Sequence, residues 1–329
     1  MVVGLGVRLI SFSLLVALAA TACASLGGNA GCPDGTPTFV YGAPNKLLRQ
    51  SDVATLTDGE QTYLTNDHLS SFPAFSSDGR RVVFSTGRDG EFHADLGFER
   101  LALFTGSPTG GDEERLTKGP FDTEPEWSPD GSKVVFVRGR GPGQRGGGHE
   151  LWTVDVETKR ERRLMHIGGH PEEADVLWSP AWSPDGKRIA FARGTLGDGR
   201  AIYGGQDLWV MDSDGSNPRK VLSDMGSALD PAGLDWSPDG DALAFDGSVD
   251  GAEGLHVMDL DDRRTRLLDK GAFYPAWSPD GSRIAYFDYL GDARLRLSLV
   301  DADGGHKDRV EGAPELTEVY GGLDWAACG

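Results

Sequence analysis

The chain has 329 residues, a formal net charge of −19, 47 glycines, 18 prolines and three cysteines. This length fits one or two domains, and so many glycines and prolines favour short strands joined by turns. A surface this acidic disfavours binding to nucleic acid and to anionic lipid headgroups. It would suit a basic partner, although a requirement for solubility is the simpler explanation of the charge.

Residues 1–22 are expected to be a signal peptide and not part of the fold. Arg8 precedes an apolar run over residues 9–20, which is too short to cross a bilayer as a permanent helix. The small residues before Cys23 resemble the cleavage site of bacterial lipoproteins, in which this cysteine is lipidated, except that Ala20 stands where leucine is usual. The same stretch also suits ordinary signal peptidase. A secreted or periplasmic soluble protein is therefore the alternative to a membrane-anchored lipoprotein.

A motif that consists of an aromatic residue followed by Ser-Pro-Asp-Gly recurs along the chain. Each copy predicts a short strand, a tight turn at Pro-Asp-Gly and a second strand. The aromatic residues of the six copies, of which the first is weaker and the last is truncated, are Phe75, Trp127, Trp182, Trp236, Trp277 and Trp325. They are 52, 55, 54, 41 and 48 residues apart, a repeat length typical of β-propeller blades. We therefore expect an all-β fold.

The last blade is predicted to be shared between the two ends of the chain. Trp325 begins a blade that the C-terminus does not complete, whereas residues 32–35 contain the turn of the motif with cysteine in place of serine. A strand is expected at residues 38–41, and residues 47–48 and 53–56 can supply the third and fourth strands. The prediction is a six-bladed β-propeller with its last blade closed by N- and C-terminal strands.

The cysteines fit this closure. Lipidation of Cys23 would leave Cys32 and Cys328 as a pair in an oxidising compartment, near the cut turn of the shared blade. Neighbouring antiparallel strands lie at distances that a disulfide can span, so we expect this bridge; two free thiols are the alternative. The predicted organisation is a signal peptide, a lipidated tether over residues 23–31 and a propeller over residues 32–329.

The repeats point to a known family. The run Trp-Ser-Pro-Asp-Gly-x-x-Ile-Ala-Phe, followed by Asp-Leu-Trp-Val-Met-Asp and an Asp-x-Asp-Gly turn, resembles the repeats of TolB-like β-propellers over about residues 32–328. The resemblance implies a binding platform on which partners dock at the channel mouth. TolB carries a smaller α/β domain before its propeller, for which no room is expected here. Related propellers cap serine peptidases, but the sequence lacks the Gly-x-Ser-x-Gly motif of those hydrolases.

Long, dissimilar connections are predicted on one rim, at residues 87–100, 139–149, 165–179 and 194–206, and short, similar turns on the other. Variable loops on a rigid frame are where binding residues are usually found.

Acidic and aromatic residues near the predicted inner strands form the candidate binding rim. The acidic ones, placed just before inner strands, are Asp122, Glu124, Asp230, Asp235 and Asp324. Together they would focus negative potential on a cation or a basic peptide at the channel mouth. The alternative is that they cap strand ends by accepting backbone N–H bonds. Tyr274 and Tyr320 could stack on a ligand there or pack between neighbouring loops.

No metal site or cofactor is predicted. His166 and His170 would share a face only on a helix, and the glycines and proline around them favour a loop. The Asp-x-Asp-Gly segments at 212–215 and 301–304 lack the remaining ligands of calcium loops and are expected to be hairpin turns. Calcium on a propeller axis would leave no trace in the sequence.

These observations favour a non-catalytic, extracytoplasmic binding or scaffold protein. It would be a monomer that contacts the membrane only through its lipid and binds a protein, peptide or glycan at the variable rim and channel mouth. The alternatives are a metal-dependent polysaccharide lyase or hydrolase acting at the channel, and a purely structural envelope protein. Three or more metal ligands converging in the channel would favour the enzyme.

Overall fold

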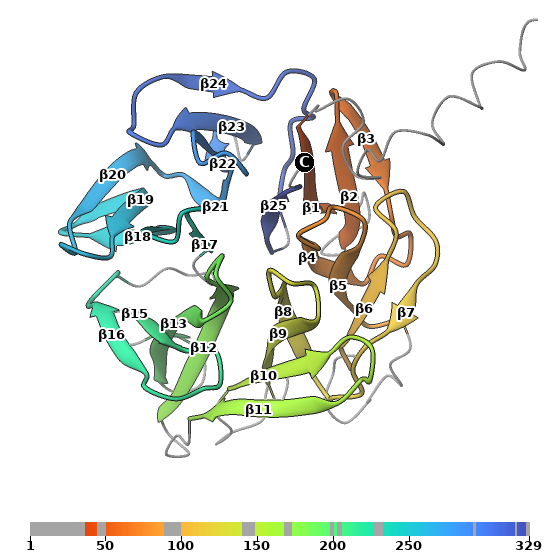
Figure 1. Cartoon of the computed structure of the whole chain (residues 1–329). Helices are drawn as coiled ribbons and strands as arrows, with labels where there is room; N and C mark the ends of the chain where they lie inside the picture. The colour runs from red at the N-terminus through yellow and green to blue at the C-terminus, as the bar shows by residue number, and fades with distance from the viewer. Residues whose placement is uncertain are drawn as a thin grey trace, which may run out of the picture.

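The computed structural model describes residues 37–44, 51–88, 100–139, 149–167, 173–197, 201–202, 206–226, 233–291, 294–319 and 321–326. These residues form six antiparallel sheets around a central axis, each with four strands in its main path (Figure 1). The predicted all-β, six-bladed propeller is therefore confirmed. Within the same ranges, no helix has the length and apolar character needed to cross a membrane.

Each blade runs from an inner strand at the axis to an outer strand. Blade 1 consists of β4 (Ser70–Phe75), β5 (Val82–Thr86), β6 (Ala102–Gly106) and β7 (Glu114–Arg115). Blade 2 consists of β8 (Asp122–Trp127), β9 (Lys133–Arg138), β10 (Glu150–Asp155) and β11 (Glu161–His166). Blade 3 consists of β12 (Glu173–Trp182), β13 (Arg188–Gly197), β15 (Asp207–Asp212) and β16 (Arg219–Leu222), with β14 (Ala201–Ile202) beside β13. Blade 4 consists of β17 (Leu234–Trp236), β18 (Ala242–Val249), β19 (Ala252–Asp259) and β20 (Thr265–Lys270). Blade 5 consists of β21 (Phe273–Trp277), β22 (Arg283–Tyr289), β23 (Leu295–Asp301) and β24 (Lys307–Arg309).

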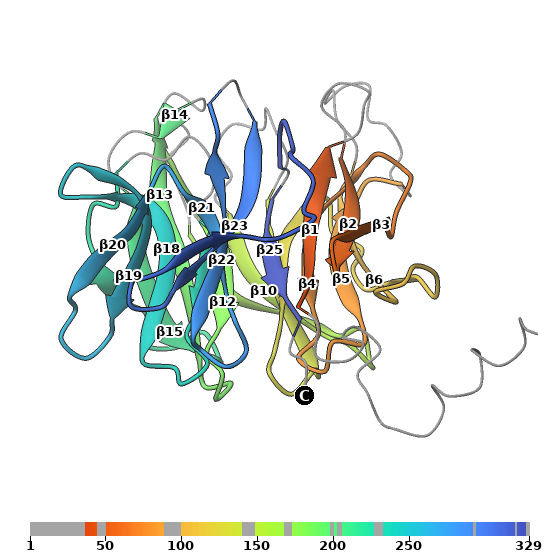
Figure 2. The ribbon, with the colours of Figure 1, turned by 90° about the horizontal axis from the view of Figure 1, so that it is seen from above.

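Blade 6 is the shared blade, and its strand order is β25 (Leu323–Trp325), β1 (Thr38–Pro44), β2 (Ser51–Thr57) and β3 (Glu60–Tyr63). Phe39 pairs with Trp325, and the Ala326 N–H donates to the Thr38 carbonyl at 2.9 Å. Figures 1 and 2 show β25 beside β1. The predicted closure by strands from the two ends of the chain is confirmed.

The prediction for the outer part of blade 6 was wrong by one strand. Residues 53–56 belong to the third strand, β2, and not to the fourth, which is β3. The missed signal is Asp58-Gly59 between β2 and β3, where both residues have positive φ angles, 52° and 74°. An Asp-Gly pair with two positive φ values is the hairpin turn that best matches strand twist.

The repeated aromatic residues pack between blades. Trp127 is buried against Ala74, Val83 and Leu103 of the preceding blade, and its Nε1–H donates to the Ala74 carbonyl at 3.3 Å. Trp236 repeats the arrangement on blade 3, with Nε1–H donating to the Ala181 carbonyl at 3.0 Å. Each such side chain removes apolar surface from both sheets and so fixes one blade against the next.

The predicted placement of the short turns on one rim is supported by hydrogen bonds between them. The Val156 N–H, at the turn after β10, donates to the carbonyl of Ser132, in the turn before β9. Ser213 and Lys187 make the equivalent bond in blade 3.

Blade 3 departs from the prediction at the opposite rim. Parts of the expected loops 165–179 and 194–206 are strand, since β12 begins at Glu173 and β13 continues to Gly197. Val176 and Leu177 are buried, so apolar burial extends the hairpin beyond its neighbours. In Figure 2, β14 lies at the end of this extension.

Cys23, Cys32 and Cys328 lie outside the described residues, and the predicted lipidation and disulfide stay predictions.

Candidate functional site

The inner strands share an irregularity that shapes the channel mouth. In blades 1, 2, 3 and 5 the pairing register shifts just before the aromatic residue of the motif, which marks a β-bulge. The third residue before the aromatic residue there has a positive φ of 48–53°: Phe72, Glu124, Ser179 and Tyr274. Glycine occupies this position in blades 4 and 6, at Gly233 and Gly322. The bulges turn these residues toward the axis.

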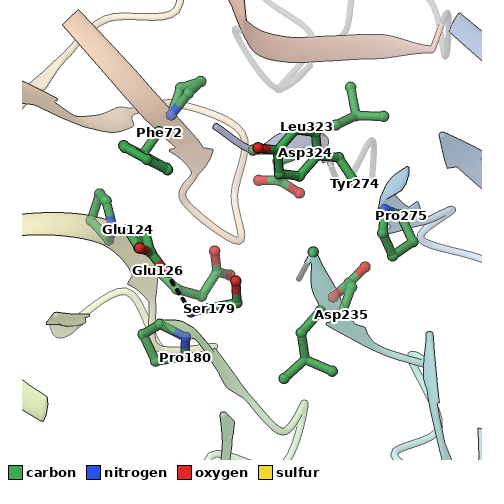
Figure 3. A pocket seen from close by; sticks show the side chains of 15 residues that line it. Phe72, Glu124, Glu126, Ser179, Pro180, Asp235, Tyr274, Pro275, Leu323 and Asp324 are labelled. Atoms are coloured by element: carbon green, nitrogen blue, oxygen red, sulfur yellow. Dashed lines mark hydrogen bonds between the residues drawn. The ribbon is translucent and has the colours of Figure 1, made fainter. Parts of the chain in front are cut away.

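A cavity of about 90 Å³ lies at this mouth. All six inner strands contribute to its lining, and Figure 3 shows their side chains facing one space. Phe72 and Tyr274 supply aromatic walls, and prolines from four blades complete much of the rest. The Asp246 carboxylate accepts hydrogen bonds from the backbone N–H groups of Gly233 and Tyr274, and so holds the backbone beside Tyr274 in place.

Carboxylates enter the cavity from every second blade. The residue directly before the aromatic residue is acidic in blades 2, 4 and 6 and is alanine in blades 1, 3 and 5. The acidic residues are Glu126, Asp235 and Asp324, and all three line the cavity. We call these three residues the carboxylate ring.

Two members of the carboxylate ring tie neighbouring blades together. Asp235 of blade 4 accepts the Trp277 N–H of blade 5 at 2.6 Å. Asp324 of blade 6 accepts the Phe75 N–H of blade 1 at 2.6 Å and the N–H of Trp325 at 2.7 Å. Burial raises the pKa of Asp235 to about 7, assisted by the charge of Asp324, although the Trp277 N–H opposes the rise. Burial likewise raises the pKa of Asp324 to about 6, although the two hydrogen bonds that it accepts from backbone N–H groups lower its pKa.

Glu126 is the exception within the carboxylate ring. No hydrogen bond or ion pair with another described residue reaches its side chain, although protein surrounds it closely and its remaining exposed surface faces the cavity. Burial, followed by the charges of Asp324 and Asp235, raises the pKa of its carboxyl well above the ordinary value. In blade 2 the contact with the next blade comes from Glu124, whose Oε2 accepts the Ser179 N–H. Burial raises the pKa of Glu124 to about 7.

The structure brings some of the predicted site residues together. Glu124, Asp235, Asp324 and Tyr274 line one cavity, whereas Asp230 and Tyr320 lie outside the described residues. The acidic residues lie within inner strands and not before them. Asp235 and Asp324 each face the cavity and also accept a backbone N–H bond, as the alternative of strand capping expected.

Asp122 does not line this cavity. Its fully buried carboxylate accepts bonds from Nε and Nη2 of Arg138 at 2.7 and 2.8 Å, and it is absent from the cavity lining. Glu126, which the sequence prediction omitted, takes its place. The signal that could have identified Glu126 is its position directly before the motif's aromatic residue, which it shares with Asp235 and Asp324.

No metal centre is found in the described part of the chain, where no three His, Cys, Asp or Glu side chains lie close enough together to hold one ion. His166 instead contacts Glu150, with Nδ1 2.9 Å from Oε1. The carboxylate ring can therefore present negative charge around the axis, but its members do not converge on a single ion.

The fold and this cavity define a six-bladed β-propeller with an acidic channel mouth. The profile of the TolB beta propeller domain matches residues 143–314, more than half of the chain. The chain belongs to this family.

Individual relatives agree with the family assignment. Atu1656 of Agrobacterium fabrum is 28% identical over 252 residues, 70% of this chain and 72% of the relative. The Tol-Pal system protein TolB of Anaeromyxobacter dehalogenans is 32% identical over 130 residues, and that match covers 39% of this chain and only 26% of the relative. Among solved structures, TolB from Acinetobacter baumannii superposes with a TM-score of 0.64 at 18% identity, covering 88% of this chain and 66% of that one. An oligogalacturonate lyase in complex with manganese has a TM-score of 0.51 at 17% identity, covering 83% and 72%, and shares the fold alone.

Proposed function

We propose that this protein is a binding propeller without catalytic activity, which recruits a protein or peptide that carries basic groups at the channel mouth. The observation that carries the proposal is the cavity itself: four half-buried carboxylates, Glu124, Glu126, Asp235 and Asp324, face one space. No Lys, Arg or His side chain among the described residues forms an ion pair with any of them. Partly desolvated negative charge without a partner is unfavourable unless a bound group supplies the opposite charge.

The surroundings of the cavity support recognition of a macromolecule. The mouth is open to solvent, and its walls combine aromatic rings, prolines and carboxylates, the mixture with which a protein surface anchors a projecting side chain. The curated relative named as a Tol-Pal system protein belongs by that name to a multi-protein system. A protein partner for this chain is consistent with that relationship.

We place the protein outside the cytoplasm as a monomer, held at the membrane by lipid on Cys23. The apolar run over residues 9–20 and the small residues before Cys23 support this location. Mass spectrometry of the mature N-terminus distinguishes the two forms of the proposal: a diacylated Cys23 supports the lipid anchor, and an unmodified mature N-terminus supports a soluble protein.

Site-specific photo-crosslinking tests the binding surface. Tyr274, at the mouth, is replaced by a photoreactive phenylalanine analogue, and Tyr63, which is 51% exposed on the outer strand β3, is replaced in the same way as the control. In intact cell envelopes we expect a discrete cross-linked protein band from position 274 and none from position 63. Identical bands from both positions, or none from either, would show that the mouth is not the binding surface.

A further inference from the structure

Glu126 has no structural contact that explains its place in the carboxylate ring. In blades 4 and 6 the ring residue holds the next blade by accepting a backbone N–H, but in blade 2 Glu124 does this instead. Glu126 is left half-buried, without a partner among the described residues, and directed into the cavity. Removing water from a carboxylate without pairing it costs stability, so a ligand is the physical reason to retain it.

We propose that the carboxylate ring binds a primary ammonium group on an aliphatic stem, which enters along the channel axis. This inference rests on the proposed function and specifies the group that the mouth recognises. It applies to the lysine side chain of a protein partner, and the same chemistry is present in a free aliphatic amine.

The symmetry of the ring selects an ammonium group. Its three carboxylates come from alternate blades of a six-bladed ring, so they surround the axis with approximate threefold symmetry. An ammonium has three N–H donors spaced evenly around its C–N bond, so a stem on the axis directs one donor toward each carboxylate. A guanidinium directs its donors within one plane, and that plane would contain the axis, so it cannot address all three equally.

The spacing of the ring disfavours a bare metal ion. In the described residues no three potential ligands lie close enough to share an ion, and backbone N–H groups hold Asp235 and Asp324 in place. The ring therefore cannot contract around an ion without breaking contacts between blades. A larger cationic group with hydrogen-bond donors fits this arrangement better.

The walls above the ring suit the stem of such a ligand. Phe72, Tyr274, Leu234 and Leu323 line the cavity together with prolines. Lysine commonly buries its methylene groups against apolar surface while its charge reaches polar partners, and an aromatic ring adds attraction to the cation. A ligand with a short or branched stem would lose these contacts.

The test uses isothermal titration calorimetry on the full mature protein at pH 8, above the pKa values of Asp235, about 7, and Asp324, about 6. The probes are four end-blocked pentapeptides that differ only at the central residue, which is lysine, arginine, trimethyl-lysine or alanine. The lysine peptide is expected to bind at least tenfold more tightly than the other three. Equal binding of the arginine peptide, or no binding of the lysine peptide, would overturn the proposal.

Variants and a second amine separate the remaining outcomes. Glu126→Gln is expected to weaken binding of the lysine peptide at least tenfold, and Asp235→Asn, which keeps an oxygen acceptor for the Trp277 N–H, should do the same. Glu157→Gln, at an exposed turn, makes the same change in net charge and should leave binding unaltered. Unaltered binding by Glu126→Gln would overturn the proposal.

1,5-Diaminopentane distinguishes the sources of the ammonium. Weaker binding than that of the lysine peptide identifies a protein side chain as the natural ligand, whereas tighter binding identifies a free amine. If the lysine peptide fails to bind while position 274 still cross-links a protein, the ammonium proposal falls and the proposed function stands. If cross-linking also fails, both fall.

Discussion

Glu126 is the residue at which stability and binding are expected to conflict. Because its half-buried carboxyl has no partner among the described residues and its charged form is repelled by Asp235 and Asp324, replacing it with neutral glutamine removes a group whose charged form is unfavourable. We expect Glu126→Gln to raise the free energy of unfolding by about 1–3 kcal/mol at pH 8, measured by urea denaturation. The exposed control Glu157→Gln should change it by less than about 0.5 kcal/mol. A destabilised Glu126→Gln protein would mean that the carboxylate has a structural partner.

The raised pKa of Asp235 predicts a pH dependence with a definite sign. Its folded value, about 7, lies above the ordinary value of 3.8, so the folded state holds this proton more tightly than the unfolded state does. The associated stability is complete below about pH 4 and is lost as the pH rises through 7. Between pH 5 and 8, the wild type should therefore lose about 2–3 kcal/mol of unfolding free energy relative to Asp235→Asn.

This comparison cancels the titrations of groups outside the carboxylate ring, whereas Asp324 and Glu126 interact with Asp235 and form part of the measured difference. His149 and His256 have pKa values lowered by burial, which makes stability rise with pH in the same range, but they contribute equally to both proteins. Urea denaturation of the two proteins at four pH values gives the difference directly. Parallel stability curves would show that Asp235 titrates normally.

At the scale of residues, the sequence predicts only some of the side chains that line the cavity. Asp235 and Asp324 could be predicted because each immediately precedes a repeated tryptophan at a strand predicted to be innermost. Asp122 was misplaced because sequence does not reveal a pairing partner sixteen positions away, Arg138, which removes it from the mouth. Which acidic residues would lack partners depends on the bulges and on contacts between blades, and neither is visible before the strands are assembled.

The inner strands and their aromatic residues hold the blades to one another. Trp236 is 4% exposed and packs on blade 3, with its Nε1–H bonded to the Ala181 carbonyl. Trp236→Ala is expected to cost about 3–5 kcal/mol of unfolding free energy, because it leaves a cavity between two sheets. Tyr63→Ala, on an exposed outer strand, should cost less than about 1 kcal/mol. Thermal and urea denaturation test both, and similar losses would argue against the interblade role.

Elements were predictable where the motif repeats and less so elsewhere. A Trp-Ser-Pro-Asp-Gly turn joins two paired strands, as the motif predicts, for example β17 and β18. The outer strands of blade 6 lack the motif, and there the Asp58-Gly59 turn was overlooked. In blade 3, the apolar run around Val176 lengthens β12, a consequence of burial that the turn-rich flanks of that segment obscured.

At the scale of the whole molecule, the ring closes where the ends of the chain pair. The pairing reaches Thr38 and Ala326, six and two residues from Cys32 and Cys328. A disulfide between these cysteines would constrain nearly the entire chain in the unfolded state and add up to about 5 kcal/mol of stability. We expect non-reducing peptide mass spectrometry to find the two cysteines joined and Cys328→Ser to lower the unfolding temperature. Two free thiols in the purified mature protein would exclude the bridge.

The six-bladed ring and its closure could be predicted because they depend on one repeated physical unit. A four-stranded sheet cannot bury both faces alone, so six copies of about 41–55 residues must pack against one another. The identity of the partner could not be predicted, because it depends on what one cavity at the axis recognises. The repeat determines where that cavity lies, and its few non-repeated residues determine its chemistry.

The central claim is that the partner binds at the channel mouth through the carboxylate ring. The most direct test is the affinity of the protein cross-linked at position 274, once purified, for the wild type, Glu126→Gln and Glu157→Gln. We predict that Glu126→Gln binds at least tenfold more weakly than the wild type, while Glu157→Gln binds equally well. Equal affinities for all three proteins would contradict the account.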